Sequence, residues 1–251
     1  MDARGRGHTT TTMIFHYVRH GLPIYNPDQL TPAGHLQAAA VAKRLARFGI
    51  DRIFSSDSNR AIETARPTAE LCGREIEILD WCNEGRAWQC TARPSGKGWT
   101  SWVFCSPEYM RKLSLPEVLA LGDLWYTHPL FADDHFQEGF ETIAREVDGL
   151  FAALGYVHDR KTHTFKAERA NDDRVALFAH EGMGAMFLSS LLDIPYPIFS
   201  TRFDLTHTGL VSLEFRSVED GRFIPTVLTY GNDSHLYAEN LPTKFMGRVN
   251  I

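Results

Sequence analysis

Two histidines occupy matching positions in the chain, each directly after a short apolar run. His20 follows the run 14–18, and His180 follows a later run of the same kind. Arg19 adjoins the first histidine, and Arg60 lies just past another apolar run. Imidazole can serve as a nucleophile near neutral pH, and guanidinium groups bind phosphate through paired N–H groups. Together these side chains predict a pocket for a phosphate group.

The surrounding sequence indicates alternating strands and helices. Short apolar runs predict strands over 14–18, 52–55, 75–79, 174–179, 210–215 and 223–230. Apolar residues three and four positions apart predict helices over 32–48, 59–71, 140–154 and 183–192. We therefore expect a three-layer α/β/α sandwich with a mostly parallel sheet. Because the carboxyl ends of parallel strands share one edge, His20 and His180 are expected to meet there.

The periodic pattern weakens from about 84 to 137, where glycine, proline, serine and aromatic residues are frequent and one helical stretch is expected near 116–126. All five tryptophans lie between positions 81 and 125. We expect residues 13–251 to form a single domain with a lid-like insertion at about 84–137. The insertion either lines the mouth of the site or forms a minor core. Residues 1–12 lack an apolar segment and are expected to be a disordered leader.

Composition excludes several classes of protein. The net charge of −5 argues against a nucleic-acid partner, and no apolar run is long enough for a membrane helix. The four cysteines form no CxxC pair, which argues against a zinc site and suits reduced thiols in the cytoplasm. His158 and His163 stand in a polar stretch and are expected to be solvated. No heptad pattern predicts an oligomeric state.

Four ordered motifs resemble the histidine phosphatase superfamily, in its phosphoglycerate-mutase-like branch. They are VRHG at 18–21, LTPAGHLQA at 30–38, SSDSNRAIETA at 55–65 and FAHEG at 178–182. The motifs of that branch run RHG, LTxxGxxQA, SxxxRAxxTA and a later strand that ends in histidine. The resemblance extends over most of the chain, apart from the leader and the 84–137 region. It implies a phosphoglycerate-mutase-like version of the α/β sandwich expected above.

The resemblance also implies roles for individual residues. His20 would be the nucleophile, whose neutral imidazole attacks phosphorus and forms a phosphohistidine. Arg19, Arg60 and His180 would hold the phosphoryl oxygens and stabilise their charge. Asn26 matches a family position that also contacts the phosphate. Fixed cationic side chains would stand where magnesium stands in other phosphoryl-transfer sites, so neither a metal nor another cofactor is expected.

The proton donor for the leaving oxygen has two candidates. A carboxyl group with a pKa near neutrality suits this role. In the branch that the chain resembles, a glutamate shortly after the third strand supplies the proton, and Glu84 lies there. The acid-phosphatase branch uses the acidic residue directly after its second histidine, which here is Glu181. We prefer Glu84 and keep Glu181 as the alternative.

The expected function is metal-independent hydrolysis of small-molecule phosphomonoesters in the cytoplasm. A phosphoglycerate-type phosphomutase is one alternative, but the residues after Glu84 read GRAW where the mutases carry Arg-His-Tyr-Gly. Leu22 is another departure, because many relatives carry glutamate after RHG. A non-catalytic module that binds a phospho-ligand or a protein is the third possibility, and the intact set of histidines and arginines argues against it. The sequence does not identify the substrate.

Overall fold

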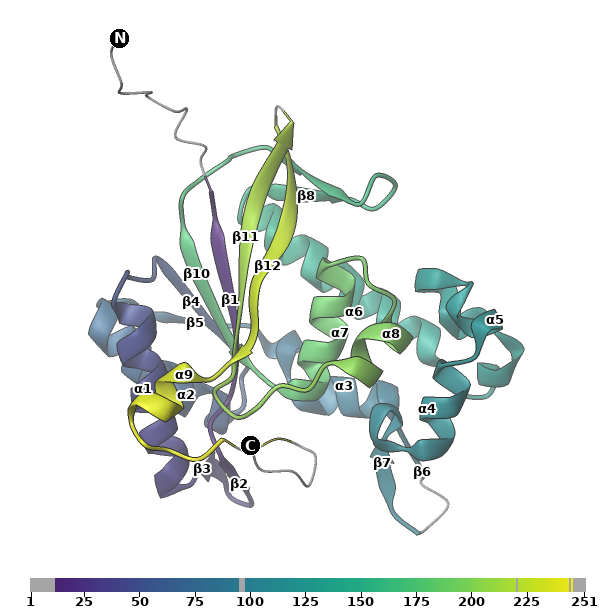
Figure 1. Ribbon diagram of the computed structural model, residues 1–251, viewed down its shortest axis with the longest axis horizontal. Coiled ribbons are helices and arrows are strands. Elements are labelled where there is room, and N and C mark those ends of the chain that lie inside the picture. The colour runs from purple at the N-terminus through teal and green to yellow at the C-terminus, as the bar shows by residue number, and fades with distance from the viewer. Residues whose placement is uncertain (1–11, 95–97, 220, 244, 246–251) are drawn as a thin grey trace.

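The computed structural model describes residues 12–94, 98–219, 221–243 and 245. Its central element is an eight-stranded sheet (Figure 1). In spatial order the strands are β5 (Ile76–Ile78), β4 (Arg52–Ser55), β10 (Arg174–Ala179), β1 (Ile14–Arg19), β11 (Leu210–Glu219), β12 (Arg222–Asn232), β9 (Thr164–Ala167) and β8 (Tyr156–Asp159). The strands from β5 to β1 pair in parallel, and those from β1 to β8 pair antiparallel. Strand β1 therefore joins the two halves of the sheet.

Helices cover both faces of the sheet, which confirms the predicted α/β sandwich (Figure 1). One face carries α1 (Pro32–Ala46), α2 (Asn59–Cys72) and α9 (Ser234–Ala238), and the other carries α3 (Glu84–Thr91), α6 (Phe136–Ala153), α7 (Glu181–Leu191) and α8 (Tyr196–Arg202). Because side chains alternate along a strand, β1 contributes to two apolar cores. Phe15 and Tyr17 belong to the core beneath α6 and α7, whereas Val18 belongs to the core beneath α1 and α2.

The region 84–137 contains more regular structure than its sequence pattern indicates. Its elements are α3, β6 (Ala92–Pro94), β7 (Thr100–Trp102), η2 (Val103–Cys105), α4 (Pro107–Leu113), α5 (Pro116–Leu119), η3 (Gly122–Thr127) and η4 (Pro129–Phe131). Three of these short helices begin at a proline, a position that proline tolerates well. Trp125 is 1% exposed and contacts the rings of Phe131 and Tyr196, and it belongs to the same apolar core as Phe15 and Tyr17 rather than to a separate minor core. The lid role of the region stays a prediction.

The hairpin of β8 and β9 corrects one expectation from the sequence. His158 is not solvated: its side chain is 0% exposed, and its two ring nitrogens lie 3.0 Å from Asp148 and 3.0 Å from Asp193. These carboxylates come from α6 and from the segment after α7, so local polarity could not reveal them. His163, by contrast, is exposed as expected.

The predicted leader, residues 1–12, lies outside the described residues except for Thr12. The backbone N–H of Thr12 donates to Asp172 Oδ1 at 2.7 Å. No helix in the described part of the chain combines the length and apolar character needed to cross a membrane.

Candidate active site

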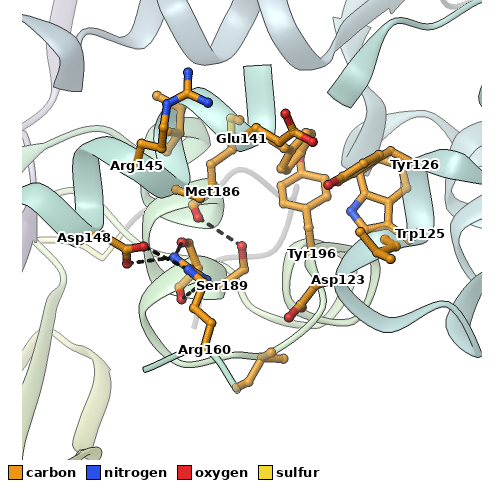
Figure 2. A pocket seen from close by; sticks show the side chains of 16 residues that line it. Asp123, Trp125, Tyr126, Glu141, Arg145, Asp148, Arg160, Met186, Ser189 and Tyr196 are labelled. Carbon is orange, nitrogen blue, oxygen red and sulfur yellow. Dashed lines mark hydrogen bonds and ion pairs between the residues drawn. The ribbon is translucent and has the colours of Figure 1, made fainter. Parts of the chain in front are cut away.

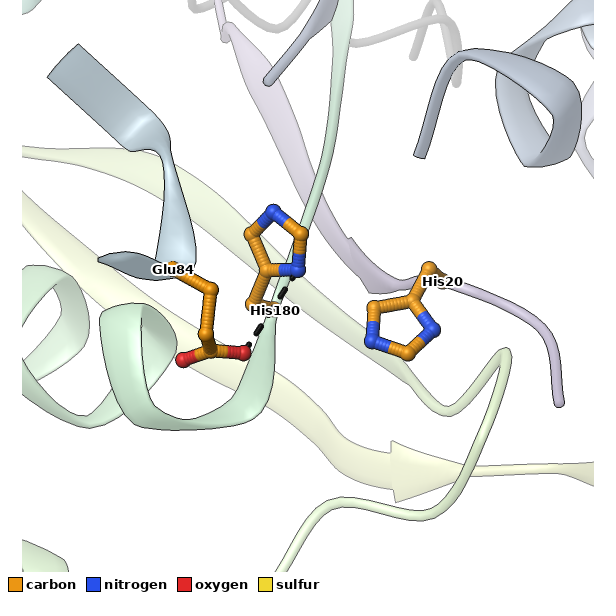
Figure 3. A group of neighbouring side chains, drawn as sticks. All are labelled: His20, Glu84 and His180. Atoms are coloured by element: carbon orange, nitrogen blue, oxygen red, sulfur yellow. Dashed lines mark ion pairs between the residues drawn. The ribbon is translucent and has the colours of Figure 1, made fainter. Parts of the chain in front are cut away.

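Strands β1 and β10 deliver the two histidines to the same edge of the sheet. The strands are parallel neighbours in which Arg19 lies opposite Ala179, so the next residue of each strand is His20 and His180. Their ring centroids are 5.2 Å apart, and the residues are 1% and 0% exposed. The predicted meeting of the two histidines at the carboxyl ends of the strands is confirmed (Figure 3).

The imidazole of His20 is held with one nitrogen available for attack. Its Nδ1 lies 2.7 Å from the carbonyl oxygen of Gly21, which can only accept a hydrogen bond. We therefore assign the proton to Nδ1, which leaves a lone pair on Nε2. Burial, with further contributions from His180, Arg19 and Arg60, lowers the pKa of His20 well below its usual value. The ring is therefore neutral at physiological pH, as a nucleophile must be.

Two buried guanidinium groups flank the histidines. Arg60 donates from Nη1 to Asp28 Oδ1 at 2.7 Å, and its Nη2 lies 3.1 Å from His180 Nδ1. Arg19 is fixed by the carbonyl of Leu205 at 2.5 Å and by Glu181 at 2.5 Å. The Nε–H groups of both arginines are buried and have no hydrogen-bond partner among the described residues. Buried donors of this kind suit an oxyanion ligand.

The second histidine is held by hydroxyl groups from the loop after β4. His180 Nε2 lies 2.8 Å from Ser56 Oγ and 3.1 Å from Ser58 Oγ. Burial first, and then Arg60 and Arg19, lower the pKa of His180 well below its usual value. His180 also occupies the N-cap of α7, where the helix dipole favours bound anions.

The two candidate proton donors have different surroundings. Glu84 begins α3, and its Oε2 lies 3.5 Å from His180 Nδ1, as Figure 3 shows. Burial raises the pKa of Glu84 to about 7, although Arg19 and Arg60 oppose the shift. Glu181 instead pairs with Arg19 at 2.5 Å, and burial raises its pKa to about 8. Glu84 is therefore the carboxyl group next to His180, whereas Glu181 is occupied in fixing an arginine.

His20, Glu84 and His180 also resemble a metal-binding set, because one ligand atom from each lies within 4.8 Å of the other two. Two observations make an anion the better occupant. The guanidinium groups of Arg19 and Arg60 lie close enough to shift the pKa values of all three residues, and they would repel a cation. In addition, His180 Nδ1, the ring nitrogen that lies 3.5 Å from Glu84, is also 3.1 Å from Arg60 Nη2.

Several motif residues hold the His20 loop. The N–H of Gly21 donates to Thr64 Oγ1 at 2.9 Å, and the N–H of Leu22 donates to Gln37 Oε1 at 2.8 Å. Gly34 is required for a different reason, because a Cβ atom there would lie 2.3 Å from the carbonyl oxygen of Leu22. The motifs in the two helices thus fix the backbone on which His20 stands.

We expect the substitution Thr64→Val to lower the free energy of unfolding by about 1–3 kcal/mol, because it leaves the buried N–H of Gly21 unpaired. Thr68→Val is the matched control. Thr68 lies one turn later on α2, is also 0% exposed, and its hydroxyl has no hydrogen-bond partner within the described ranges. Urea denaturation should show a loss for the first variant and none for the second. Equal losses would contradict this role of Thr64.

The structure separates Asn26 from the other predicted residues. Asn26 lies at the exposed turn between β2 (Pro23–Tyr25) and β3 (Asp28–Leu30), and its phosphate contact stays a prediction. Asp28, two residues later, binds Arg60 and was not anticipated from the sequence. His207 also joins the site: its Nε2 lies 3.3 Å from Arg19 Nη2, and its ring centroid is 5.7 Å from that of His20. In the sequence, His207 lies shortly before the apolar run 210–215, and this position was the signal that could have identified it as a site residue.

A cavity of about 440 Å³ lies apart from this site, between η3, α6 and α7 (Figure 2). Its walls include Trp125, Tyr126 and Tyr196, with Arg145 and Arg160 among the charged residues. None of the residues that line it belongs to the set around His20. The cavity is therefore separate from the candidate active site.

Comparisons with known proteins agree with this geometry. Residues 15–93 match the sequence model of the histidine phosphatase superfamily (branch 1). A probable phosphoglycerate mutase, GpmB, from Enterobacter sp. (strain 638) is 40% identical over 72 residues, which is 25% of this chain and 33% of that protein. The aligned stretch thus spans about a third of the relative's length.

Two solved structures share the fold. The phosphoserine phosphatase of Entamoeba histolytica, in complex with 3-phosphoglyceric acid, has a TM-score of 0.54 at 20% identity, covering 89% of this chain and 99% of the other. The phosphoglycerate mutase of Bacillus anthracis str. Sterne has a TM-score of 0.56 at 17% identity, with coverages of 92% and 98%. The sequence match contains the His20 loop and the Arg60 helix. Residues 15–93 are thus similar in sequence to the histidine phosphatase superfamily, and the chain as a whole shares its fold with the two solved structures.

Proposed function

We propose that the protein is a phosphomonoester hydrolase that forms a phosphohistidine on His20. One observation carries the proposal: the free Nε2 of a neutral, buried imidazole stands beside His180 and two fixed guanidinium groups. A phosphoryl group placed there would meet a nucleophile and donors for its oxygens. Small phosphate esters are the substrates of this proposal, supported by the complex of the Entamoeba neighbour with 3-phosphoglyceric acid.

The proposed reaction has two steps, and the positions of these groups support each of them. The lone pair of His20 Nε2 attacks phosphorus, and the bond between phosphorus and the ester oxygen breaks. Arg19, Arg60 and His180 bind the phosphoryl oxygens as they gain charge. The departing oxygen takes the proton of Glu84. Water then attacks the phosphohistidine, returns a proton to Glu84, and releases inorganic phosphate and free imidazole.

Glu84 suits the role of proton donor because burial raises its pKa to about 7, so a large fraction is protonated near neutral pH. Glu181 remains the alternative, although its ion pair with Arg19 gives it a structural task. We propose that no metal takes part, because the arginines supply the positive charge. The four unpaired cysteines support a proposed cytoplasmic location.

A phosphoglycerate-type mutase is the second candidate, and the similarity of 72 residues to the Enterobacter protein favours it. The segment after Glu84 argues for the hydrolase. The mutases carry Arg-His-Tyr-Gly in this stretch, and the arginine that this chain has there is Arg86. Its side chain is 52% exposed and pairs with Asp80 at 3.5 Å.

Incubation of the purified protein with phosphate esters in the presence of a metal chelator tests this function. Phosphorus NMR should show inorganic phosphate from acetyl phosphate and from alkyl phosphates. With 3-phosphoglycerate, a mutase would instead produce the 2-phospho isomer without free phosphate. A protein that binds phosphate yet turns over none of these compounds would be the non-catalytic module, and the hydrolase proposal would be wrong.

A further inference from the structure

An aromatic cluster meets the proposed proton donor at the N-terminus of α7. A Cβ atom on Gly182 would lie 2.4 Å from the six-membered ring of Trp102 and 2.7 Å from Glu84 Oε1. The edge of the indole and the carboxylate therefore meet over the same glycine. Glu84 is held there by the backbone N–H of Met183, which donates to its Oε1 at 3.1 Å.

Neighbouring rings fix the position of Trp102. Phe104 stacks on it with a centroid distance of 5.4 Å, and Trp88 meets it edge-on at 4.8 Å. The backbone of Trp102 pairs with Ala92 in the two-stranded sheet of β6 and β7. We call Trp88, Trp102 and Phe104 the aromatic platform. Trp88 is 37% exposed and the other two rings are partly exposed, so the platform retains apolar surface in contact with solvent.

The direction of the reaction places the leaving group on this side. In the proposed hydrolysis, His20 attacks phosphorus from one side, and the ester oxygen departs in line on the other. Glu84 protonates that oxygen, so the carbon attached to the oxygen must lie beside Glu84. The platform adjoins Glu84 across Gly182, so an alcohol bound beside Glu84 would lie next to it.

We propose that the preferred substrates are phosphate monoesters whose alcohol carries an apolar ring, and that Trp102 is the main residue that selects them. This inference rests on the proposed hydrolase activity and adds the class of leaving group. Aromatic rings stack on or pack edge-to-face against indole, and they displace water from the platform, whereas a small or charged alcohol gains little there. All three residues of the platform lie in the 84–137 region. None of the four motifs that resemble the histidine phosphatase superfamily lies in that region.

The test compares alcohols of similar acidity, so that only their contacts differ. We expect kcat/KM for 2-phenylethyl phosphate and 2-cyclohexylethyl phosphate to exceed that for ethyl phosphate by at least about tenfold. Trp102→Ala should remove most of this preference, and Trp102→Phe should retain much of it. Phe48→Ala is the matched control, because Phe48 is 70% exposed and contacts Arg174 at the start of β10, the opposite end of that strand from His180.

Acetyl phosphate separates the possible failures, because its leaving group has no ring and needs no proton donor. If the wild-type protein hydrolyses acetyl phosphate but shows no preference between ethyl and 2-phenylethyl phosphate, the platform proposal is wrong while the hydrolase stands. If acetyl phosphate is not hydrolysed either, the proposed function itself fails. A Trp102→Ala variant that hydrolyses acetyl phosphate normally and keeps the full preference also overturns the proposal. If that variant does not fold, Trp88→Ala, which removes the more exposed indole, should lower the preference in its place.

Discussion

Replacement of His20 by alanine is expected to reduce the turnover of every phosphate ester by at least about 10⁴-fold, because the variant lacks the atom that attacks phosphorus. The loss should be the same for acetyl phosphate and for alkyl phosphates, since both pass through the same phosphohistidine. Stopped-time assays of inorganic phosphate measure the rate. Rapid quenching with ³²P-labelled substrate should place label on the wild-type protein but not on His20→Ala.

The matched control for this variant is His16→Asn. His16 lies on β1, four residues before His20, and its Nδ1 is 3.0 Å from Ser212 Oγ. Burial lowers the pKa of His16 to about 4, so a low pKa alone does not distinguish the nucleophile. The control should retain label and activity. A His20→Ala variant that still releases phosphate at the wild-type rate would refute the mechanism.

The second large effect is expected from Glu84→Gln, and it should depend on the leaving group. An alkoxide must be protonated as it departs, so we expect ethyl phosphate hydrolysis to fall by about 10²–10⁴-fold. Acetate leaves without a proton, so hydrolysis of acetyl phosphate should fall by less than about tenfold. Glu181→Gln provides the comparison. Loss of its ion pair with Arg19 should slow both substrates to a similar degree.

The pH profile gives the same assignment independently. Below pH 7 the carboxyl group of Glu84 is largely protonated and able to donate, and above pH 7 it loses that proton. The value of kcat/KM for ethyl phosphate should therefore decline as the pH rises through about 7, and Glu84→Gln should abolish this decline. If the decline persists in Glu84→Gln and disappears in Glu181→Gln, then Glu181 is the proton donor.

The parts of the site that sequence reasoning found are those encoded by local pattern. His20 and His180 each follow an apolar strand, and parallel pairing of those strands is enough to bring them together. Glu84 was indicated by the resemblance to the histidine phosphatases rather than by a local pattern, and the structure puts it 3.5 Å from His180. Its raised pKa is caused by burial in the folded chain, which no local pattern reports.

The contacts that sequence reasoning missed join distant segments. Asp28 binds Arg60 across 32 positions, and Arg19 Nη2 lies near His207 across 188 positions. A single sequence gives no sign of which polar residues pair over such separations. The tryptophans show a related limit, because one cluster in the sequence divides into two environments. Trp125 is buried in the core that also contains Phe15 and Tyr17, whereas Trp102 adjoins Glu84.

The position of β1 between the parallel and antiparallel halves of the sheet has a consequence for how the molecule opens. A strand with hydrogen-bonded neighbours on both sides exchanges its amide protons only when much of the domain unfolds. The short helices and the two-stranded hairpin of the 84–137 region have fewer such restraints. We therefore expect His20 to follow a part of the chain that opens late, and the aromatic platform to belong to a part that can rearrange locally. Substitutions in that region can change which esters fit without disturbing the strand on which the chemistry depends.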